Sequence, residues 1–208
     1  MEDDDQEGSA VRKLIVAEYL SLDGVVQAPG HAGEDPAGGF ARGGWTGPYM
    51  ADHGRYNSEF YQTAGGFLLG RLTYEIFAAY WPTVTNEGNE VARALNTLPK
   101  YVASTTLQQA DWKGTTFLKG DVPAAVADLR RQPGRPLVVV GSAQLAQTLL
   151  DADLVDEYQL WLHPIVLGSG KRLFRDAGAA ATLRLVDSKT TSGGLVILTY
   201  GRAGAAPN

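Results

Sequence analysis

One segment, residues 136–174, constrains the fold more than any other part of the chain. It opens with a short apolar run, Leu137–Val140, which is too short for a helix and rich in β-branched side chains, so it predicts a buried strand. Gly141 and Ser142 follow directly. The next residues carry apolar side chains at helical spacing: Leu145, Ala146, Leu149 and Leu150. The segment therefore predicts a strand that passes through a tight turn into a helix.

A strand–turn–helix unit of this kind leaves backbone N–H groups free at the helix N-terminus, where a phosphate binds well. A second glycine-bearing turn, residues 168–172, contains the two cations Lys171 and Arg172. Together the two turns indicate a nucleotide site. Either glycine turn also has a simpler interpretation, a backbone that needs positive φ, and the sequence contains neither a GxGxxG nor a P-loop pattern.

The rest of the chain alternates strand and helix patterns. Strands are predicted at residues 13–20, 66–70, 100–104, 115–118, 157–163, 183–187 and 195–200. Helices are predicted at residues 52–63, 71–77 and 91–98, and after a capping Asp121. This order predicts an α/β fold with a mostly parallel sheet covered on both faces. The glycine turn at residues 192–194 predicts a C-terminal antiparallel hairpin.

Composition restricts the class of protein. With 208 residues, 44% of them hydrophobic, we expect one domain over residues 12–202, an acidic disordered tail over 1–11 and a short tail over 203–208. A net charge of -5 without a basic cluster argues against a nucleic-acid partner. No apolar run is long enough for a membrane span, and the acidic start is unlike a signal peptide. The absence of cysteine fits a cytoplasmic protein.

Metal chemistry has no support in the sequence. The three histidines, His31, His53 and His163, are far apart and have no ligand spacing, so we expect no metal site. The sequence also lacks the GxSxG motif of a hydrolase nucleophile elbow.

Three predicted strands end in small or polar residues: Gly70 and Arg71, Ser104 and Thr105, and Gly141 and Ser142. Because ligands bind beyond the carboxyl ends of parallel strands, these turns would share one binding edge. A cation at a helix N-terminus is unfavourable, so Arg71 needs an anionic partner. That partner is either a bound phosphate or Glu75, one helical turn further on.

The long glycine- and proline-rich segment at residues 27–49 predicts a lid, a binding loop or a disordered segment. Asp23 lies just before it, after the first strand, where a carboxylate would orient a polar heterocycle or form an Asx-turn with Gly24. Trp45 and Tyr49 in the loop would stack on a ligand ring or anchor the loop itself.

Several motifs, in order, resemble the dihydrofolate-reductase-like superfamily, and within it the C-terminal reductase domain of the bifunctional riboflavin-biosynthesis deaminase/reductase. They are SLDG (21–24), LLGRLTYE (68–75), YVAST (101–105), VGSAQLAQTLL (140–150), LVDEYQL (154–160) and PIVLGSGKRLF (164–174). The resemblance covers residues 12–202. It implies a dihydrofolate-reductase-like three-layer α/β sandwich and NADPH-dependent hydride transfer.

The resemblance also implies roles for individual residues. Those expected at the dinucleotide are Tyr19, Leu20, Gly70, Arg71, Thr73, Ser104, Thr105, Gly141, Ser142, Ala143 and Gln144. Those expected at the substrate are Asp23, Trp45 and Tyr49. Relatives often carry Arg where this chain has Thr105, which leaves NADH as an alternative cofactor. Asp52 and Glu59 are the two candidates for the acidic residue that binds the pterin ring in folate reductases.

We therefore expect an NADPH-dependent reductase of a small pyrimidine or pteridine heterocycle, as in the reduction of 5-amino-6-(5-phosphoribosylamino)uracil or of dihydrofolate. The alternative is a protein on the same fold that binds a nucleotide or flavin-like ligand without turnover. We also expect a homodimer, because Tyr158, Trp161 and the terminal hairpin offer apolar strand surface.

Overall fold

The computed structural model of the chain describes residues 11–203. Apart from Val11 and Ala203, the two predicted tails lie outside these residues. Within the described part, no helix combines the length and the apolar character that crossing a membrane requires.

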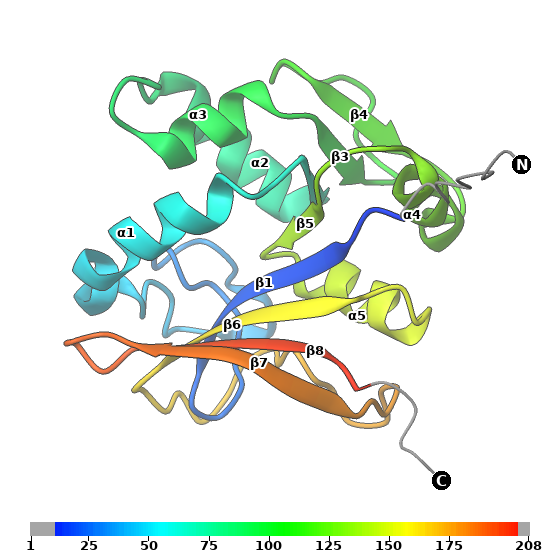
Figure 1. The fold of residues 1–208 in the computed structure, drawn as a ribbon. Coiled ribbons are helices and arrows are strands. Elements are labelled where there is room, and N and C mark those ends of the chain that lie inside the picture. Colours follow the sequence, from blue (N-terminus) through cyan, green and yellow to red (C-terminus); the bar gives the residue numbers. More distant parts are fainter. Residues whose placement is uncertain (1–10, 204–208) are drawn as a thin grey trace, which may run out of the picture.

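Eight strands form one sheet in the described chain (Figure 1). They are β1 (Leu14–Ser21), β2 (Gly66–Gly70), β3 (Lys100–Ala103), β4 (Thr115–Leu118), β5 (Leu137–Val140), β6 (Glu157–His163), β7 (Leu183–Thr190) and β8 (Val196–Arg202). Their order across the sheet is β4-β3-β2-β5-β1-β6-β8-β7. The pairs from β4 to β6 are parallel, and β8 pairs antiparallel with both β6 and β7. This confirms the predicted parallel sheet with its C-terminal hairpin.

Five α-helices connect these strands in the described residues. They are α1 (Met50–Tyr61), α2 (Arg71–Tyr80), α3 (Glu90–Thr97), α4 (Val122–Arg131) and α5 (Ala143–Asp151). Helix α4 starts as predicted, because the Asp121 side chain accepts a hydrogen bond from the N–H of Ala124. Helix α2 continues three residues past the predicted end and passes into a short 3-10 turn, Trp81–Thr83, which contains Pro82.

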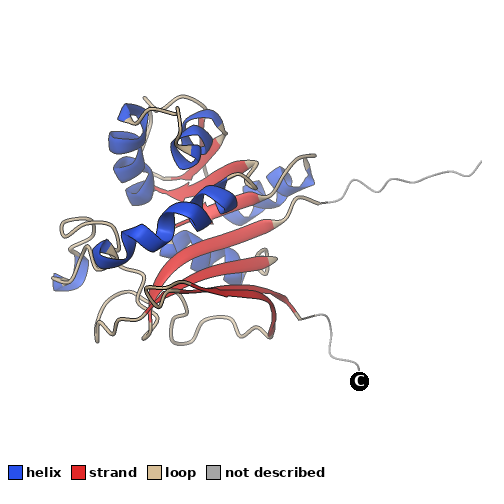
Figure 2. Ribbon diagram, turned by 60° about the vertical axis from the view of Figure 1, so that its left-hand side comes forward, coloured by secondary structure: helices blue, strands red, loops and turns tan. Residues whose placement is uncertain are grey.

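Helices cover both faces of the sheet, and Figure 2 shows them in front of and behind the strands. Successive side chains of β1 point to opposite faces of the sheet and so contribute to two separate hydrophobic cores. Leu14 and Val16 pack with the apolar residues of α4 and α5, whereas Ile15 and Ala17 pack with those of α1, α2 and α3. The central strands are buried on both faces, which explains why they are mostly apolar rather than alternating.

The position of β6 in the sheet differs from the exposed strand on which the predicted homodimer depends. Strand β6 lies between β1 and β8, so Tyr158 and Trp161 are 2% and 1% exposed. These two side chains offer no surface to a partner, and that part of the expectation is wrong. Within the hairpin, β7 at the edge of the sheet presents apolar side chains, with Leu185 and Val186 each about half exposed. The homodimer stays a prediction, now with β7 as its basis.

We expect size-exclusion chromatography with light scattering to give twice the chain mass of 22.2 kDa. Val186→Lys should shift the protein toward the monomer, because it places a charge on the exposed strand edge. The matched control is Val166→Lys, at a similarly exposed valine away from β7. A monomer at every concentration for the unaltered chain would contradict the prediction.

Candidate functional site

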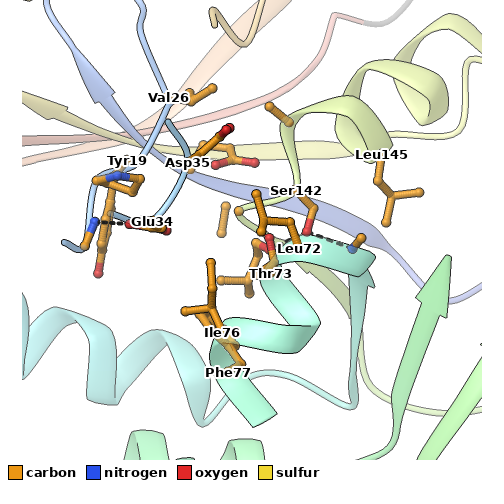
Figure 3. A pocket seen from close by; sticks show the side chains of 18 of the residues that line it. Tyr19, Val26, Glu34, Asp35, Leu72, Thr73, Ile76, Phe77, Ser142 and Leu145 are labelled. Atoms are coloured by element: carbon orange, nitrogen blue, oxygen red, sulfur yellow. Dashed lines mark hydrogen bonds between the residues drawn. The ribbon is translucent and has the colours of Figure 1, made fainter. Parts of the chain in front are cut away.

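A cleft of about 1400 Å³ opens where the central parallel strands end. Its walls come from the carboxyl ends of β1, β2, β3 and β5, the helices that follow β2 and β5, helix α1 and the loop after β1. In Figure 3, Leu72, Thr73, Ile76 and Phe77 of α2 lie across the cleft from Tyr19 and Glu34. The cleft is therefore at the edge where a ligand of an open α/β sheet is expected.

Two helix N-termini meet in this cleft. Gly70 precedes α2 and Ser142 precedes α5, and neither helix has a side-chain cap on its first N–H groups. The backbone N–H of Gly70 donates to Ser142 Oγ at 2.9 Å, which joins the two turns directly (Figure 3). Ser142 Oγ in turn donates to the carbonyl of Val140 at 3.1 Å. Both N-termini thus present positive partial charge to the same space.

Gly141 gives the second turn its backbone conformation. Its φ is +54°, in the left-handed region, and a Cβ atom here would lie 3.4 Å from Thr73 of α2, an ordinary van der Waals distance. Ser142 also adopts a left-handed conformation, with φ 64° and ψ 45°. The positive φ, rather than a lack of space, is the reason that glycine suits position 141.

The other predicted dinucleotide residues are mostly in the same place. Ten of the eleven line the cleft: Tyr19, Gly70, Arg71, Thr73, Ser104, Thr105, Gly141, Ser142, Ala143 and Gln144. Leu20 does not, because it points into the core beside α5 and is 5% exposed. Arg71 forms the ion pair with Glu75, at 2.8 Å, that the sequence offered as its alternative partner. Both side chains are about half exposed, so the pair is weak and leaves Arg71 available at the cleft.

The predicted substrate residues support the loops around the cleft rather than lining it. Asp23 accepts hydrogen bonds from the N–H groups of Leu167 and Gly168, at 3.0 and 2.8 Å. These backbone N–H groups, led by that of Leu167, and the Ser21 hydroxyl lower the pKa of Asp23 to about 2. The carboxylate therefore holds the second glycine turn in place.

Trp45 and Tyr49 anchor the long loop. The indole of Trp45 is 5% exposed and donates to the carbonyl of Gln27 at 2.8 Å. The hydroxyl of Tyr49 reaches the carbonyl of Pro164 at 3.4 Å. Neither residue lines the cleft, so the anchoring alternative describes their contacts in this structure.

Helix α1 presents unexpected side chains to the cleft. Neither Asp52 nor Glu59 lines it, while His53 and Asn57 do. The amide of Asn57 donates to the hydroxyl of Tyr19 at 2.7 Å, and burial raises the pKa of that hydroxyl to about 12. The wall formed by this helix thus includes polar side chains but carries no carboxylate.

Two histidines that are far apart in the sequence meet beside this wall. His53 and His163 are each about 1% exposed or less, and their Nε2 atoms are 2.9 Å apart. Nδ1 of His163 lies 2.8 Å from the carbonyl of Trp161, and a carbonyl only accepts, so this nitrogen carries the proton. Nε2 of neutral His163 therefore accepts, and His53 donates from Nε2. His53 Nδ1 is left as a buried acceptor without a partner in residues 11–203.

Glu18 is the site residue that sequence reasoning missed. It is 4% exposed, lies in the middle of the apolar strand β1 and lines the cleft. Burial, followed by the charge of Glu34, raises its pKa well above the usual value. The signal was present in the sequence as a single charged residue within an otherwise apolar strand pattern.

The histidine pair should make the protein sensitive to acid. Burial, followed by the charge of His163, lowers the pKa of His53 to about 4, against 6.5 for a free histidine. The folded state binds the proton less readily than the unfolded state. The contribution of neutral His53 to the free energy of unfolding is therefore fully present above about pH 6.5, and it is lost as the pH falls toward 4.

Melting temperatures, measured by circular dichroism between pH 8 and pH 4, test this expectation. The unaltered chain should lose stability over the lower half of this range, and His53→Gln should flatten the decline. His31→Gln, at an exposed histidine, is the matched control and should keep the slope of the unaltered chain. Equal slopes for all three proteins would rule out the pair as the cause.

Comparisons with known proteins identify the relatives of the chain. The uncharacterized protein YyaP of Bacillus subtilis is 28% identical over 197 residues, which cover 91% of this chain and 94% of the relative. A solved structure from Shewanella sp. PV-4, whose name refers to riboflavin biosynthesis, has a TM-score of 0.67 at 21% identity. It covers 92% of this chain and 99% of that chain.

Dihydrofolate reductase from Enterococcus faecalis, complexed with NADP(H), has a TM-score of 0.59 at 15% identity. The match covers 92% of this chain and 97% of that chain. The model of the RibD C-terminal domain matches residues 12–197. The chain therefore belongs to the RibD C-terminal domain family and has the dihydrofolate-reductase-like fold.

Proposed function

We propose that the protein is a reductase that transfers a hydride from NADPH to a small heterocycle of the pyrimidine or pteridine type, with NADH as an alternative cofactor. The observation that carries this proposal is the pair of uncapped helix N-termini, joined through Gly70 and Ser142, that face one cleft. A dinucleotide pyrophosphate is the anion that such a pair suits best.

The strand order supports the placement of the two halves of the cofactor. Strands β2 and β5, which lead into the two helices, lie between β3 and β1. With the pyrophosphate at these helices, one nucleoside half of the cofactor would extend over the end of β3 and the other half to the end of β1. The hydroxyls of Ser104 and Thr105 at β3 suit the ribose of the adenosine. The nicotinamide would then lie at β1, next to Tyr19.

The substrate half of the cleft has the composition that a planar heterocycle needs. Apolar and aromatic walls come from Leu72, Ile76, Phe77 and Trp161. His53 and Asn57 of α1 add polar atoms on one side. The family and the resemblance support a pyrimidine or pteridine as the class of substrate.

The chemistry of hydride transfer comes from the cofactor when it is bound. The residues of this chain bind the pyrophosphate, orient the two rings face to face and exclude water. The long loop contributes to this enclosure, since Trp45 and Tyr49 hold it against the rest of the molecule. The site needs no nucleophile, because the cofactor supplies the hydride and the protein only binds and orients the reactants.

One observation favours the alternative function, a protein that binds a nucleotide or flavin-like ligand without turnover. Helix α1 turns His53 and Asn57 to the cleft, where folate reductases have an acidic residue. Turnover assays therefore need to accompany the binding measurements.

Thermal shift with NADPH and NADH is the first test. A cofactor at 100 times its Kd stabilises a protein by about 2.7 kcal/mol, or about 5–10 °C for a chain of this size. We expect this shift with NADPH, and a smaller one for Arg71→Ala because a cation at the cleft is lost.

Oxidation of NADPH with dihydrofolate, or with the ribosylaminopyrimidine that the riboflavin-pathway reductase reduces, then separates the two functions. Turnover supports the reductase, and a clear shift without turnover supports the binding protein. No shift with either cofactor would contradict the reductase and would restrict the alternative to a ligand other than NADPH or NADH.

Gly141→Ala tests whether the turn before α5 contacts the cofactor. An alanine at this position would have to adopt a strained φ of +54°, and relief of the strain would displace the turn, so NADPH should bind about tenfold more weakly. Gly24→Ala is the matched control, because Gly24 also has positive φ, +78°, but lies outside the cleft. Calorimetry should show that Gly24→Ala loses about as much stability as Gly141→Ala but keeps the NADPH affinity of the unaltered chain. Equal affinities for the two variants would show that the turn does not contact the cofactor.

A further inference from the structure

The carboxyl group of Glu18 has no role in the fold. Its Oε1 is buried and has no hydrogen-bond partner within residues 11–203. A buried carboxyl group without a partner costs stability, so a methionine of similar size would fold at least as well. Because Glu18 also lines the cleft, the natural partner of its carboxyl group is a ligand.

The neighbouring charges keep this carboxyl group free. Glu34 is engaged elsewhere, since its Oε2 accepts from the N–H groups of Gly30 and His31 at 2.5 and 3.2 Å. Lys171, a cation in the same cleft, pairs with Asp35 at 2.6 Å. No cation among these groups neutralises Glu18, and its raised pKa follows from burial and from the charge of Glu34. Both causes favour the neutral form of the carboxyl group over the ionised form.

The register of the sheet locates Glu18 relative to the two helix N-termini. Ala17 pairs with Val140 across β1 and β5, so Glu18 lies level with the turn of Gly141 and Ser142. Glu18 shares the face of β1 with Val16 and Leu20, which pack with α5. It therefore stands at the β1 end of the cleft, where the proposed function puts the nicotinamide half of the cofactor.

A neutral carboxyl group carries one donor and one acceptor side by side, O–H and C=O. A primary carboxamide presents the complementary pair, C=O and N–H. The two groups form a double hydrogen bond that neither an ionised carboxylate nor a lone hydroxyl reproduces. A nicotinamide ring carries one such carboxamide.

We propose that Glu18 is a cofactor-binding residue that pairs with the carboxamide of the nicotinamide ring through this double hydrogen bond. The inference rests on the proposed function. These two hydrogen bonds fix the rotation of the ring about the bond to its ribose, and so they select which face of the ring meets the substrate. It also satisfies the orphaned Oε1 atom, which explains why a charged residue type is tolerated inside β1.

Binding alone tests this proposal. The probes are NADPH and its reduced 3-acetylpyridine analogue, in which a methyl ketone replaces the carboxamide and removes the N–H donors. Their Kd values are measured by calorimetry for the unaltered chain, Glu18→Gln and Glu18→Met. Glutamine keeps one donor and one acceptor, whereas methionine keeps the volume and removes both. Glu59→Gln, at an exposed position outside the cleft, is the matched control.

We expect the unaltered chain, Glu18→Gln and Glu59→Gln to prefer NADPH over the analogue by about tenfold, the effect of one lost buried hydrogen bond. Glu18→Met should bind NADPH about tenfold more weakly and lose the preference. An equal preference in Glu18→Met and the unaltered chain, or no preference in either, overturns the proposal while leaving the proposed function intact. Failure of the unaltered chain to bind either probe overturns both.

Discussion

The hydrogen bond from the Gly70 N–H to Ser142 Oγ joins the two turns on which the cleft depends. Because β2 and β5 are parallel neighbours, both strands end at the same edge and both lead into a helix there. The bond connects the N-terminal turns of α2 and α5, and Gly141 supplies the positive φ of the second turn. The cleft and its positive end follow from this one junction.

The two ends of the cleft differ in chemistry because they arise from different parts of the sheet. The β3 end is open and carries hydroxyl groups, Ser104 and Thr105 among them. The β1 end lies between the two cores and contains buried titratable side chains, Glu18 and His53. Burial favours the neutral form of both groups, because it raises the pKa of Glu18 and lowers the pKa of His53 to about 4. A neutral polar site of this kind suits uncharged rings, and a positive site suits phosphates.

Buried polar atoms without partners are costly, and the β1 end of the cleft holds two of them, Glu18 Oε1 and His53 Nδ1. Elsewhere in the described chain, the polar groups near the cleft satisfy one another. The side chain of Gln27, for example, donates to the carbonyls of Asp35 and Ala37 and accepts from the N–H of Lys171. The contrast indicates that this end of the cleft is arranged for a ligand rather than for stability.

The sequence by itself determined the order of strands and helices, the turns that end β2 and β5, and nearly all residues of the proposed dinucleotide site. These features are local, since the spacing of apolar residues and the position of a glycine act within a few residues. The tertiary structure decided which side chains meet. It directed Asp23 to the turn at Leu167 and Gly168, and it paired His53 with His163 across 110 residues. It also buried Glu18 without a partner, because side-chain partners depend on which strand ends and helices become neighbours, and no local pattern records that.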